Sequence, residues 1–446
     1  MVVRCLRFAL AVSAMLTLSI TLTGCGVTRK GTEVSSSSKA SSSSHASSLA
    51  SSAVRTPGQL FTRVVRAYFH GSAGNLTSWL VAASYRHTRQ GKALLKESLF
   101  HGVYRGGAWK WTVGTPPGLP FVRFVGVGER SGQYSINVAF SGKHSVVLAR
   151  SVRSHVDLYA TTAMGARWRH YRGTISGRSR QASCMRLLRR YGATIQLVSL
   201  LRGWLIVAYN APLMNLNPGC LFETVDGGRT WSRLPTTHRI LRLYPLDASG
   251  ERLLAETGAS GANAYVGAIR SLNAGRTWHA VHFPAVIAAT SIVEVGHPFA
   301  LGRDITLPLV TQSNTPSEGA IEILRSEDGG TSWSITGSMP LRHHHYELPY
   351  ISFQLSGPSS GWALVHREVT PSSCVLVHTT NDGKTWQHLQ CEPGGLPLRW
   401  FKFVGTSGLG WASTGASLLR TSTGGRSWTT ACVVQQAVNL NCAGLS

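Results

Sequence analysis

Three observations in the sequence predict an all-β fold, a β-propeller of seven four-stranded blades. First, an eight-residue motif recurs along the chain. Second, each copy of the motif ends in Trp, and these Trp residues lie 42 to 63 residues apart, a period typical of propellers and other repeat arrays. Third, short apolar or alternating runs separated by Gly, Pro, Asn and Ser fill the chain after residue 57, which is the pattern of strands and turns.

Five close copies of the motif, called octets below, are TVDGGRTW, SLNAGRTW, SEDGGTSW, TTNDGKTW and TSTGGRSW. Their key residues are Thr224, Asp226, Gly228 and Trp231; Ser271, Asn273, Gly275 and Trp278; Ser326, Asp328, Gly330 and Trp333; Thr379, Asn381, Gly383 and Trp386; Thr421, Gly425 and Trp428. Two looser copies upstream end at Trp168 and Trp109. Seven octets, with three strands before each and one after, predict seven blades. Six blades, with the first segment as an appendage, are the alternative.

The octet predicts a structural turn and not a catalytic loop. Glycine adopts positive φ without a steric penalty, which suits a tight turn between strands. A short polar side chain can accept hydrogen bonds from backbone N–H groups of its own turn, and the following Trp buries a large ring. The third place holds Asp, Asn, Asp, Asn and Thr in the five copies, and a catalytic carboxylate could not be replaced by Thr. We therefore expect no catalytic residue in the octets.

The octets resemble the Asp-box, or BNR repeat, of sialidases, sortilin-like receptors, xyloglucanase-type glycosidases and photosystem II assembly-factor propellers. A Gly-Trp pair precedes several octets, at Gly203-Trp204, Gly361-Trp362 and Gly410-Trp411. With this pair, the chain is most similar to the photosystem II assembly-factor type of propeller, from about residue 60 to about residue 433. The resemblance implies a scaffold or assembly role, without implying photosynthesis.

Residues 1–24 predict a signal peptide. Arg4 and Arg7 precede an apolar run from Phe8 to Leu22, which is short for a membrane-spanning helix. The residues that follow, Thr23-Gly24-Cys25, complete a resemblance to a bacterial lipobox, in which Cys25 becomes the lipidated first residue; an uncleaved anchor is the alternative. Residues 25–56 are rich in serine and predict a flexible tether, so that residues 57–446 form the propeller. We expect an extracytoplasmic protein anchored to a bacterial membrane through Cys25.

Six further cysteines fit an oxidising exterior. No Cys-x-x-Cys spacing of a zinc site occurs in the chain, so disulfides are the better interpretation. Positions within the predicted blades favour three pairs: Cys374–Cys391, Cys184–Cys220 and Cys432–Cys442.

Charge is the most unusual feature of the composition. The chain has 44 basic and 19 acidic residues and a formal net charge of +25. This balance predicts attraction to anionic partners such as phospholipid headgroups, cell-wall polymers or acidic proteins. The exported location and the lack of a dense basic run argue against nucleic acid. We expect a monomer that binds a protein or an anionic polymer of the cell envelope; a purely compositional arginine excess is the alternative.

Enzymatic activity finds little support in the sequence. Glycoside hydrolysis usually needs two positioned carboxylates, and sialidases that resemble this repeat use an Arg cluster, a Tyr–Glu pair and an early Asp. The Arg-Ile-Pro signature of sialidases is absent. Three adjacent histidines, His343 to His345, cannot all face one ion in regular structure, so we expect no metal and no cofactor. The sequence thus predicts a non-catalytic binding or assembly propeller, with a divergent sialidase-like or other glycoside hydrolase as the alternative.

Overall fold

The computed structural model describes residues 60–441, except 73–74, 89–90, 106–107, 115–136, 142–144, 153–154, 162–166, 177–181, 192, 200, 208–219, 259–265, 314–317, 343–349, 367–373, 415–416 and 435–439. Chain contacts separate residues 1–54 from residues 55–446, and all described residues belong to the second unit. The predicted signal peptide, Cys25 and the tether lie outside the described residues. Within the described part, no helix has both the length and the apolar character needed to cross a membrane.

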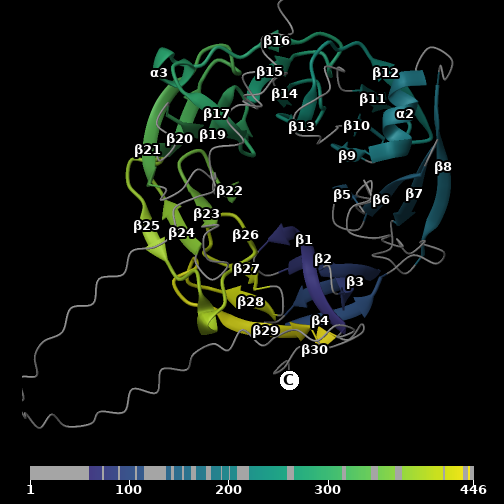
Figure 1. Cartoon of the computed structure of the whole chain (residues 1–446), viewed down its shortest axis with the longest axis vertical. Coiled ribbons are helices and arrows are strands. Elements are labelled where there is room, and N and C mark those ends of the chain that lie inside the picture. The colour runs from purple at the N-terminus through teal and green to yellow at the C-terminus, as the bar shows by residue number, and fades with distance from the viewer. Residues whose placement is uncertain are drawn as a thin grey trace, which may run out of the picture. The chain divides into compact units, whose positions relative to one another are not determined.

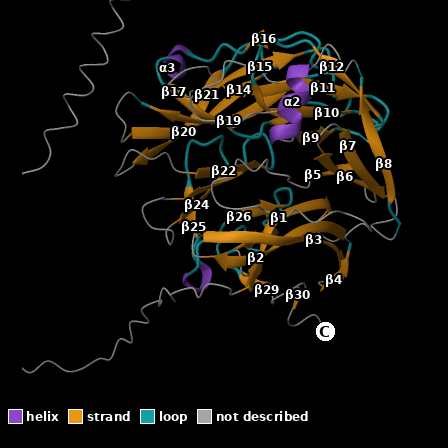
Figure 2. Cartoon of the chain, turned by 45° about the vertical axis from the view of Figure 1, so that its right-hand side comes forward, coloured by secondary structure: helices purple, strands orange, loops and turns teal. Residues whose placement is uncertain are grey.

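The described strands form a β-propeller. Figure 1 shows the sheets following one another in chain order around a common centre, with β1, β13, β22 and β26 among the strands nearest to it. Figure 2 shows the same ring from an oblique direction, with helix α2 drawn in front of the strands beside β9 and β11. All strand pairs are antiparallel, apart from one parallel contact described below.

The first half of the ring contains twelve strands. The first sheet has the order β1 (Leu60–Ser72), β2 (Asn75–Thr88), β3 (Gly91–Arg105), β4 (Ala108–Val113). The second sheet has eight strands: β5 (Asn137–Ser141), β6 (Ser145–Val152), β7 (His155–Thr161), β8 (Arg169–Ile175), β9 (Thr194–Leu197), β10 (Gly203–Val207), β11 (Cys220–Thr224) and β12 (Thr230–Leu234). Helix α2 (Ala182–Tyr191) lies between β8 and β9 in the chain.

Four more sheets complete the ring. Their strands are β13 (Ile240–Pro245), β14 (Leu253–Gly258), β15 (Val266–Ser271) and β16 (His279–Ala280); β17 (Ser291–Val295), β18 (Phe299–Leu301), β19 (Asp304–Gln312), β20 (Glu318–Ser326) and β21 (Ser334–Arg342); β22 (Tyr350–Leu355), β23 (Gly361–His366), β24 (Cys374–Thr379) and β25 (Gln387–Leu389); β26 (Trp400–Phe403), β27 (Gly410–Ser413), β28 (Ser417–Thr421), β29 (Thr429–Val434) and β30 (Leu440–Asn441). Two short helical segments, α3 (Ala285–Ala288) and η2 (Pro393–Gly395), lie in connections between sheets.

The expected blade number is wrong. Counted by hydrogen bonding, the described strands give five blades of four or five strands and one sheet of eight, instead of seven or six separate blades. The eight-stranded sheet consists of two meanders, β5–β8 and β9–β12, that β12 joins by pairing in parallel with β8. This contact places Thr230 opposite Thr174 and Trp231 opposite Ile175. The spacing of the repeats predicts the meanders, but it cannot predict a parallel contact between the outer strands of two meanders. The predicted number of separate blades is wrong for this reason.

The hydrophobic core lies between neighbouring sheets. One cluster joins Trp204, Leu221 and Leu234 of the β9–β12 meander to Leu253 and Ile269 of the next sheet, and all five are buried. Alternation along each strand produces such clusters, because successive side chains point to opposite faces of a sheet and both faces are covered by neighbours.

The Gly-Trp pairs connect one sheet to the next. Trp204 donates its indole N–H to the carbonyl of Ala274 at 3.2 Å, and Trp362 donates to the carbonyl of Gly424 at 3.2 Å. Both acceptors are the fourth residue of the octet in the next sheet of the ring. The preceding glycine is required by packing: a Cβ at Gly203 would lie 2.8 Å from the backbone oxygen of Gln196 and 2.2 Å from Leu197 Cδ2, both on the paired strand β9.

Candidate functional site

In all five octets the first side chain closes the turn. Its hydroxyl accepts a hydrogen bond from the backbone N–H of the Gly in fifth place, at 2.7 to 3.0 Å. The pairs are Gly228–Thr224, Gly275–Ser271, Gly330–Ser326, Gly383–Thr379 and Gly425–Thr421. These glycines have φ between 78° and 94°, a region that side chains with a Cβ rarely adopt.

The third side chain of each octet binds the seventh residue of the same turn. It accepts the backbone N–H of that residue at 2.8 to 3.0 Å in every copy, through Asp226, Asn273, Asp328, Asn381 and Thr423. The Asp226 carboxylate also accepts the Thr230 hydroxyl at 2.6 Å. Burial raises the pKa of Asp226, but the hydrogen bonds from Thr230 outweigh burial and hold it below its usual value. The octet carboxylates therefore serve their own turns.

The eighth residue, a Trp, packs the end of each octet against the hydrophobic core. Trp231 and Trp333 are buried, and Trp278, Trp386 and Trp428 are partly buried. Of the looser copies, Trp168 is partly buried, whereas the side chain of Trp109 and residues 162–166 lie outside what the structure describes.

Two of the expected disulfides are present, Cys184–Cys220 and Cys374–Cys391. Cys432 is also in a disulfide. Cys442 lies outside the described residues, so the pair Cys432–Cys442 stays a prediction, which the pairing of Val433 with Asn441 supports. Disulfides are typical of oxidising, extracytoplasmic compartments.

A cluster of charged side chains occupies the inner end of two adjacent sheets. Arg242 on β13 faces Glu256 on β14 across the strand pair, and Glu294 belongs to β17 of the next sheet. The Arg242 Nη1 atom lies 2.5 Å from Glu294 Oε1 and 3.4 Å from Glu256 Oε2. The exposed fractions of these side chains are 48% for Arg242, 20% for Glu294 and 5% for Glu256. Tyr244 donates its hydroxyl to the carbonyl of Val295 at 2.9 Å, so hydrogen bonds and ion pairs join the two sheets here.

One guanidinium serves two carboxylates in this cluster, and their environments differ. Burial raises the pKa of Glu256 to about 7; the Arg242 charge opposes this shift and the Glu294 charge adds to it. Burial lowers the pKa of Arg242, but the charges of Glu256 and Glu294 outweigh burial and raise it. The Oε2 atom of Glu256 is buried and has no hydrogen-bond partner, which agrees with Arg242 pairing mainly with the nearer Glu294.

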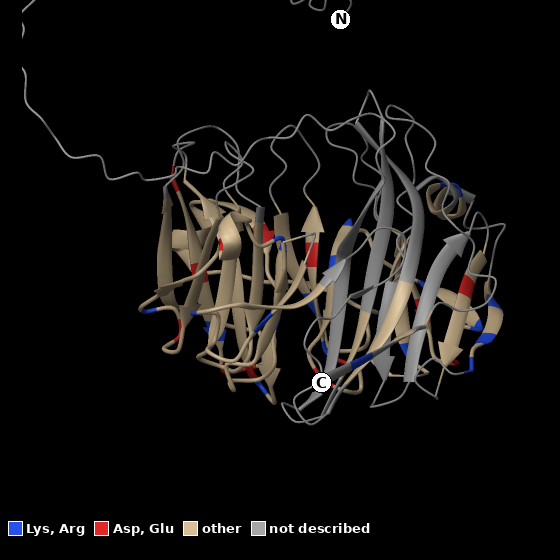
Figure 3. Ribbon diagram, turned by 90° about the horizontal axis from the view of Figure 1, so that it is seen from below, with Lys and Arg blue, Asp and Glu red and all other residues tan. Residues whose placement is uncertain are grey.

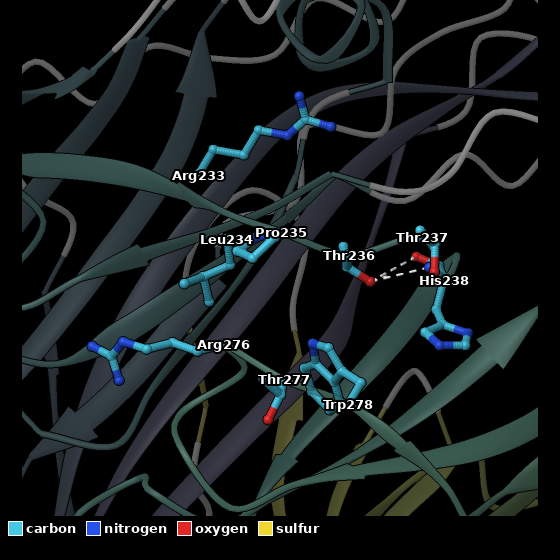
Figure 4. Close-up of a pocket in the computed structure, with 9 residues that line it drawn as sticks. All are labelled: Arg233, Leu234, Pro235, Thr236, Thr237, His238, Arg276, Thr277 and Trp278. Carbon is cyan, nitrogen blue, oxygen red and sulfur yellow. Dashed lines mark hydrogen bonds between the residues drawn. The ribbon is translucent and has the colours of Figure 1, made fainter.

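A pocket of about 580 Å³ lies between β12 and the octet of the following sheet. Its lining contains two arginines, one histidine and one tryptophan and no carboxylate: Arg233, Leu234, Pro235, Thr236, Thr237, His238, Arg276, Thr277 and Trp278. Figure 4 shows the Trp278 indole near the centre, with His238 and the guanidinium of Arg276 on opposite sides of it. Its volume is within the range of roughly 300 to 1,000 Å³ typical of small-ligand sites.

Sequence reasoning missed both the charged cluster and the pocket. Arg242, Glu256 and Glu294 have no motif around them, and only the register of β13 with β14 reveals the first pair. The sialidase features named above are present only in part: the charged cluster holds two carboxylates, Glu256 and Glu294, but among the described residues Arg242 is its one arginine and no Arg cluster forms. Among the described residues, no group of three or more His, Cys, Asp or Glu is placed to hold a metal ion. His343 to His345 lie outside them.

No family model and no curated protein sequence matches the chain. Solved structures similar to it include a polysaccharide lyase of family PL25, an ulvan lyase bound to -[GlcA(1-4)Rha3S]- (11% identity, TM-score 0.44, covering 69% of this chain and 87% of that one). They also include YCF48 bound to D1 peptide (13%, 0.29, 65% and 93%) and the α-L-arabinofuranosidase Arb93A from Fusarium graminearum (14%, 0.34, 52% and 77%). At these identities, the likenesses concern the fold alone.

Proposed function

We propose that the chain is a lipid-anchored, extracytoplasmic Asp-box propeller that binds an anionic partner, a protein or a polymer of the cell envelope, without transforming it. The observation that carries the proposal is an imbalance between carboxylates and guanidinium groups on the folded unit. Five exposed arginines form no ion pair or side-chain hydrogen bond with any described residue: Arg167, Arg169, Arg186, Arg233 and Arg303. Figure 3 shows how the described Lys and Arg residues are spread over the strands and helix α2.

The carboxylates, in contrast to these arginines, have partners within the protein. Apart from Asp382, every Asp and Glu whose side chain is described contacts a hydrogen-bond donor, an ion-pair partner or another electrostatic partner within the protein. The carboxylates are thus engaged within the protein, whereas these guanidinium groups remain available, and an excess of available basic groups on a surface attracts anions. The same arrangement leaves few carboxylates available for chemistry, which supports binding over catalysis.

Membrane anchoring and anion binding are tested separately. Replacing Cys25 (Cys25→Ser) should release the protein from membranes or leave the precursor unprocessed, because the thiol is the acceptor of the lipid. Unchanged labelling of this variant by a radioactive fatty acid would contradict the anchor.

Binding of the mature chain to anionic vesicles or wall polymer should weaken steeply with salt, since exposed charges are screened within about 10 Å at 0.1 M.

A second candidate function, glycoside hydrolysis, is favoured by one observation. Glu256 and Glu294 contact the same nitrogen of Arg242, and burial raises the pKa of Glu256 to about 7. A carboxyl group with a raised pKa beside a second carboxylate is typical of a general acid next to a nucleophile or base. Turnover of aryl glycosides that Glu256→Gln and Glu294→Gln both abolish would establish this function. No turnover by the unmodified protein, together with salt-sensitive anion binding, would establish the first.

A further inference from the structure

We infer that the pocket between β12 and the following octet binds a chain of negatively charged sugars. The inference rests on the proposed function and names the ligand class of one site on this surface. Its first support is charge: Arg233 and Arg276 line the pocket, and no Asp or Glu does.

The two arginines contribute in different ways. Arg276 is held in place, because its Nη2 atom lies 3.3 Å from Glu223 Oε2 and its Nη1 donates to the carbonyl of Asn273 at 3.1 Å. Arg233 forms no ion pair with any described residue and is free to meet an anion. Figure 4 shows that the two guanidinium groups do not converge on one point. Such a pocket cannot clamp a single oxyanion from both sides, and it suits a ligand whose negative charges are spaced along its length.

The remaining walls favour a sugar over a peptide. The partly buried indole of Trp278 offers an apolar surface, and Thr236 and Thr237 supply hydroxyl groups beside it, a mixture that suits the apolar and hydroxylated faces of a sugar ring. A peptide would bind most readily by adding a strand to a free sheet edge. Here β16 has two residues, His279 and Ala280, and the start of β12 is already paired with β8.

The test uses the mature full chain and three probes at about 50 mM salt, where screening is weak. Tetragalacturonate is the anionic sugar, a neutral galactose tetramer controls for sugar contacts alone, and poly-L-glutamate controls for charge alone. Binding is measured by isothermal titration calorimetry. The variants are Arg233→Gln, which loses no described contact, and Arg233→Gln with Arg276→Gln. The matched control, Arg186→Gln with Arg303→Gln, removes two exposed, unpaired arginines elsewhere. Thermal unfolding checks that each variant folds.

We expect tetragalacturonate to bind and the neutral tetramer not to bind. Arg233→Gln should weaken tetragalacturonate binding about threefold and the double variant about tenfold, as expected for exposed charge pairs; the control should change it less than twofold. Thr237→Val should weaken the sugar and leave poly-L-glutamate unchanged.

Three results would overturn the inference: equal losses in the double variant and the control, poly-L-glutamate binding as sensitive to Thr237→Val as the sugar, or no binding of tetragalacturonate. If envelope polymer or anionic vesicles still bind in these cases, the proposed function stands and only the ligand of this pocket is wrong. If the unmodified chain binds no anion at all, the proposed function fails as well.

Discussion

The substitution Glu256→Gln should make the protein more stable at alkaline pH. Glu256 competes with Glu294 for Arg242 and is the farther of the two from Nη1, at 3.4 Å against 2.5 Å. It is 5% exposed, and burial raises its pKa from 4.5 to about 7. A carboxyl group with a raised pKa in the folded state binds a proton more tightly folded than unfolded. Its favourable contribution is therefore complete below pH 4.5 and is lost as pH rises through about 7.

The magnitude follows from this shift. Each pKa unit is worth about 1.4 kcal/mol, so ionisation of Glu256 should lower the free energy of unfolding by about 3 kcal/mol between the two pH limits. Glu256→Gln removes the titration and keeps the shape. The variant should therefore gain up to about 3 kcal/mol over the unmodified protein at pH 8, with a much smaller difference at pH 4.5.

Urea unfolding followed by fluorescence at both pH values measures the difference. Glu327→Gln, a substitution of the same type at an exposed side chain, controls for the chemical change. A Glu256→Gln variant that is less stable than the unmodified protein at pH 8 would refute the reasoning, because it would mean that the ion pair with Arg242 outweighs burial.

Three further substitutions test the octets, the packing between sheets and a disulfide. Asp226→Ala should lower the free energy of unfolding by about 1 to 2 kcal/mol, as the loss of a comparable capping side chain does; Asp226→Asn should recover most of this, and equal losses in both would contradict the role of the acceptor. Gly173→Ala should lower the free energy of unfolding by about 1 to 3 kcal/mol, because its Cβ would lie 2.4 Å from the carbonyl oxygen of Gly228 in the octet. Gly357→Ala, where the Cβ meets nothing within 4 Å, is the control. A loss no greater than that of the control would refute the contact. Replacing Cys184 and Cys220 by Ala should cost about 3 to 4 kcal/mol by the loop-entropy estimate, and an unchanged urea midpoint would argue against a stabilising cross-link.

The local turns could be predicted from the sequence because their chemistry is local. The first, third and fifth places of an octet determine its hydrogen bonds within a few residues. The side chains that act between sheets could not be predicted. Arg242 and Glu294 are far apart in the chain, and the parallel contact of Thr230 with Thr174 depends on how two outer strands meet in space.

The Gly-Trp pairs show the same difference between local features, which the sequence predicts, and contacts between sheets, which it does not. In the sequence these pairs contribute to the resemblance to assembly-factor propellers, but nothing in the sequence predicts the indole hydrogen bond from Trp204 to the octet of the next sheet. The pocket was missed because its lining comes from a connection, residues 235–238, and from an octet of another sheet. No periodic signal marks either segment as part of a binding site.

One titration decides whether the propeller binds an anionic partner without transforming it. The mature full chain is bound to envelope fragments of the producing cell while NaCl is raised from about 50 to about 500 mM, and the released material is analysed by mass spectrometry. We expect saturable binding that weakens steeply with salt, and no cleavage products. Binding that is insensitive to salt, or the release of sugar or peptide fragments, would contradict it.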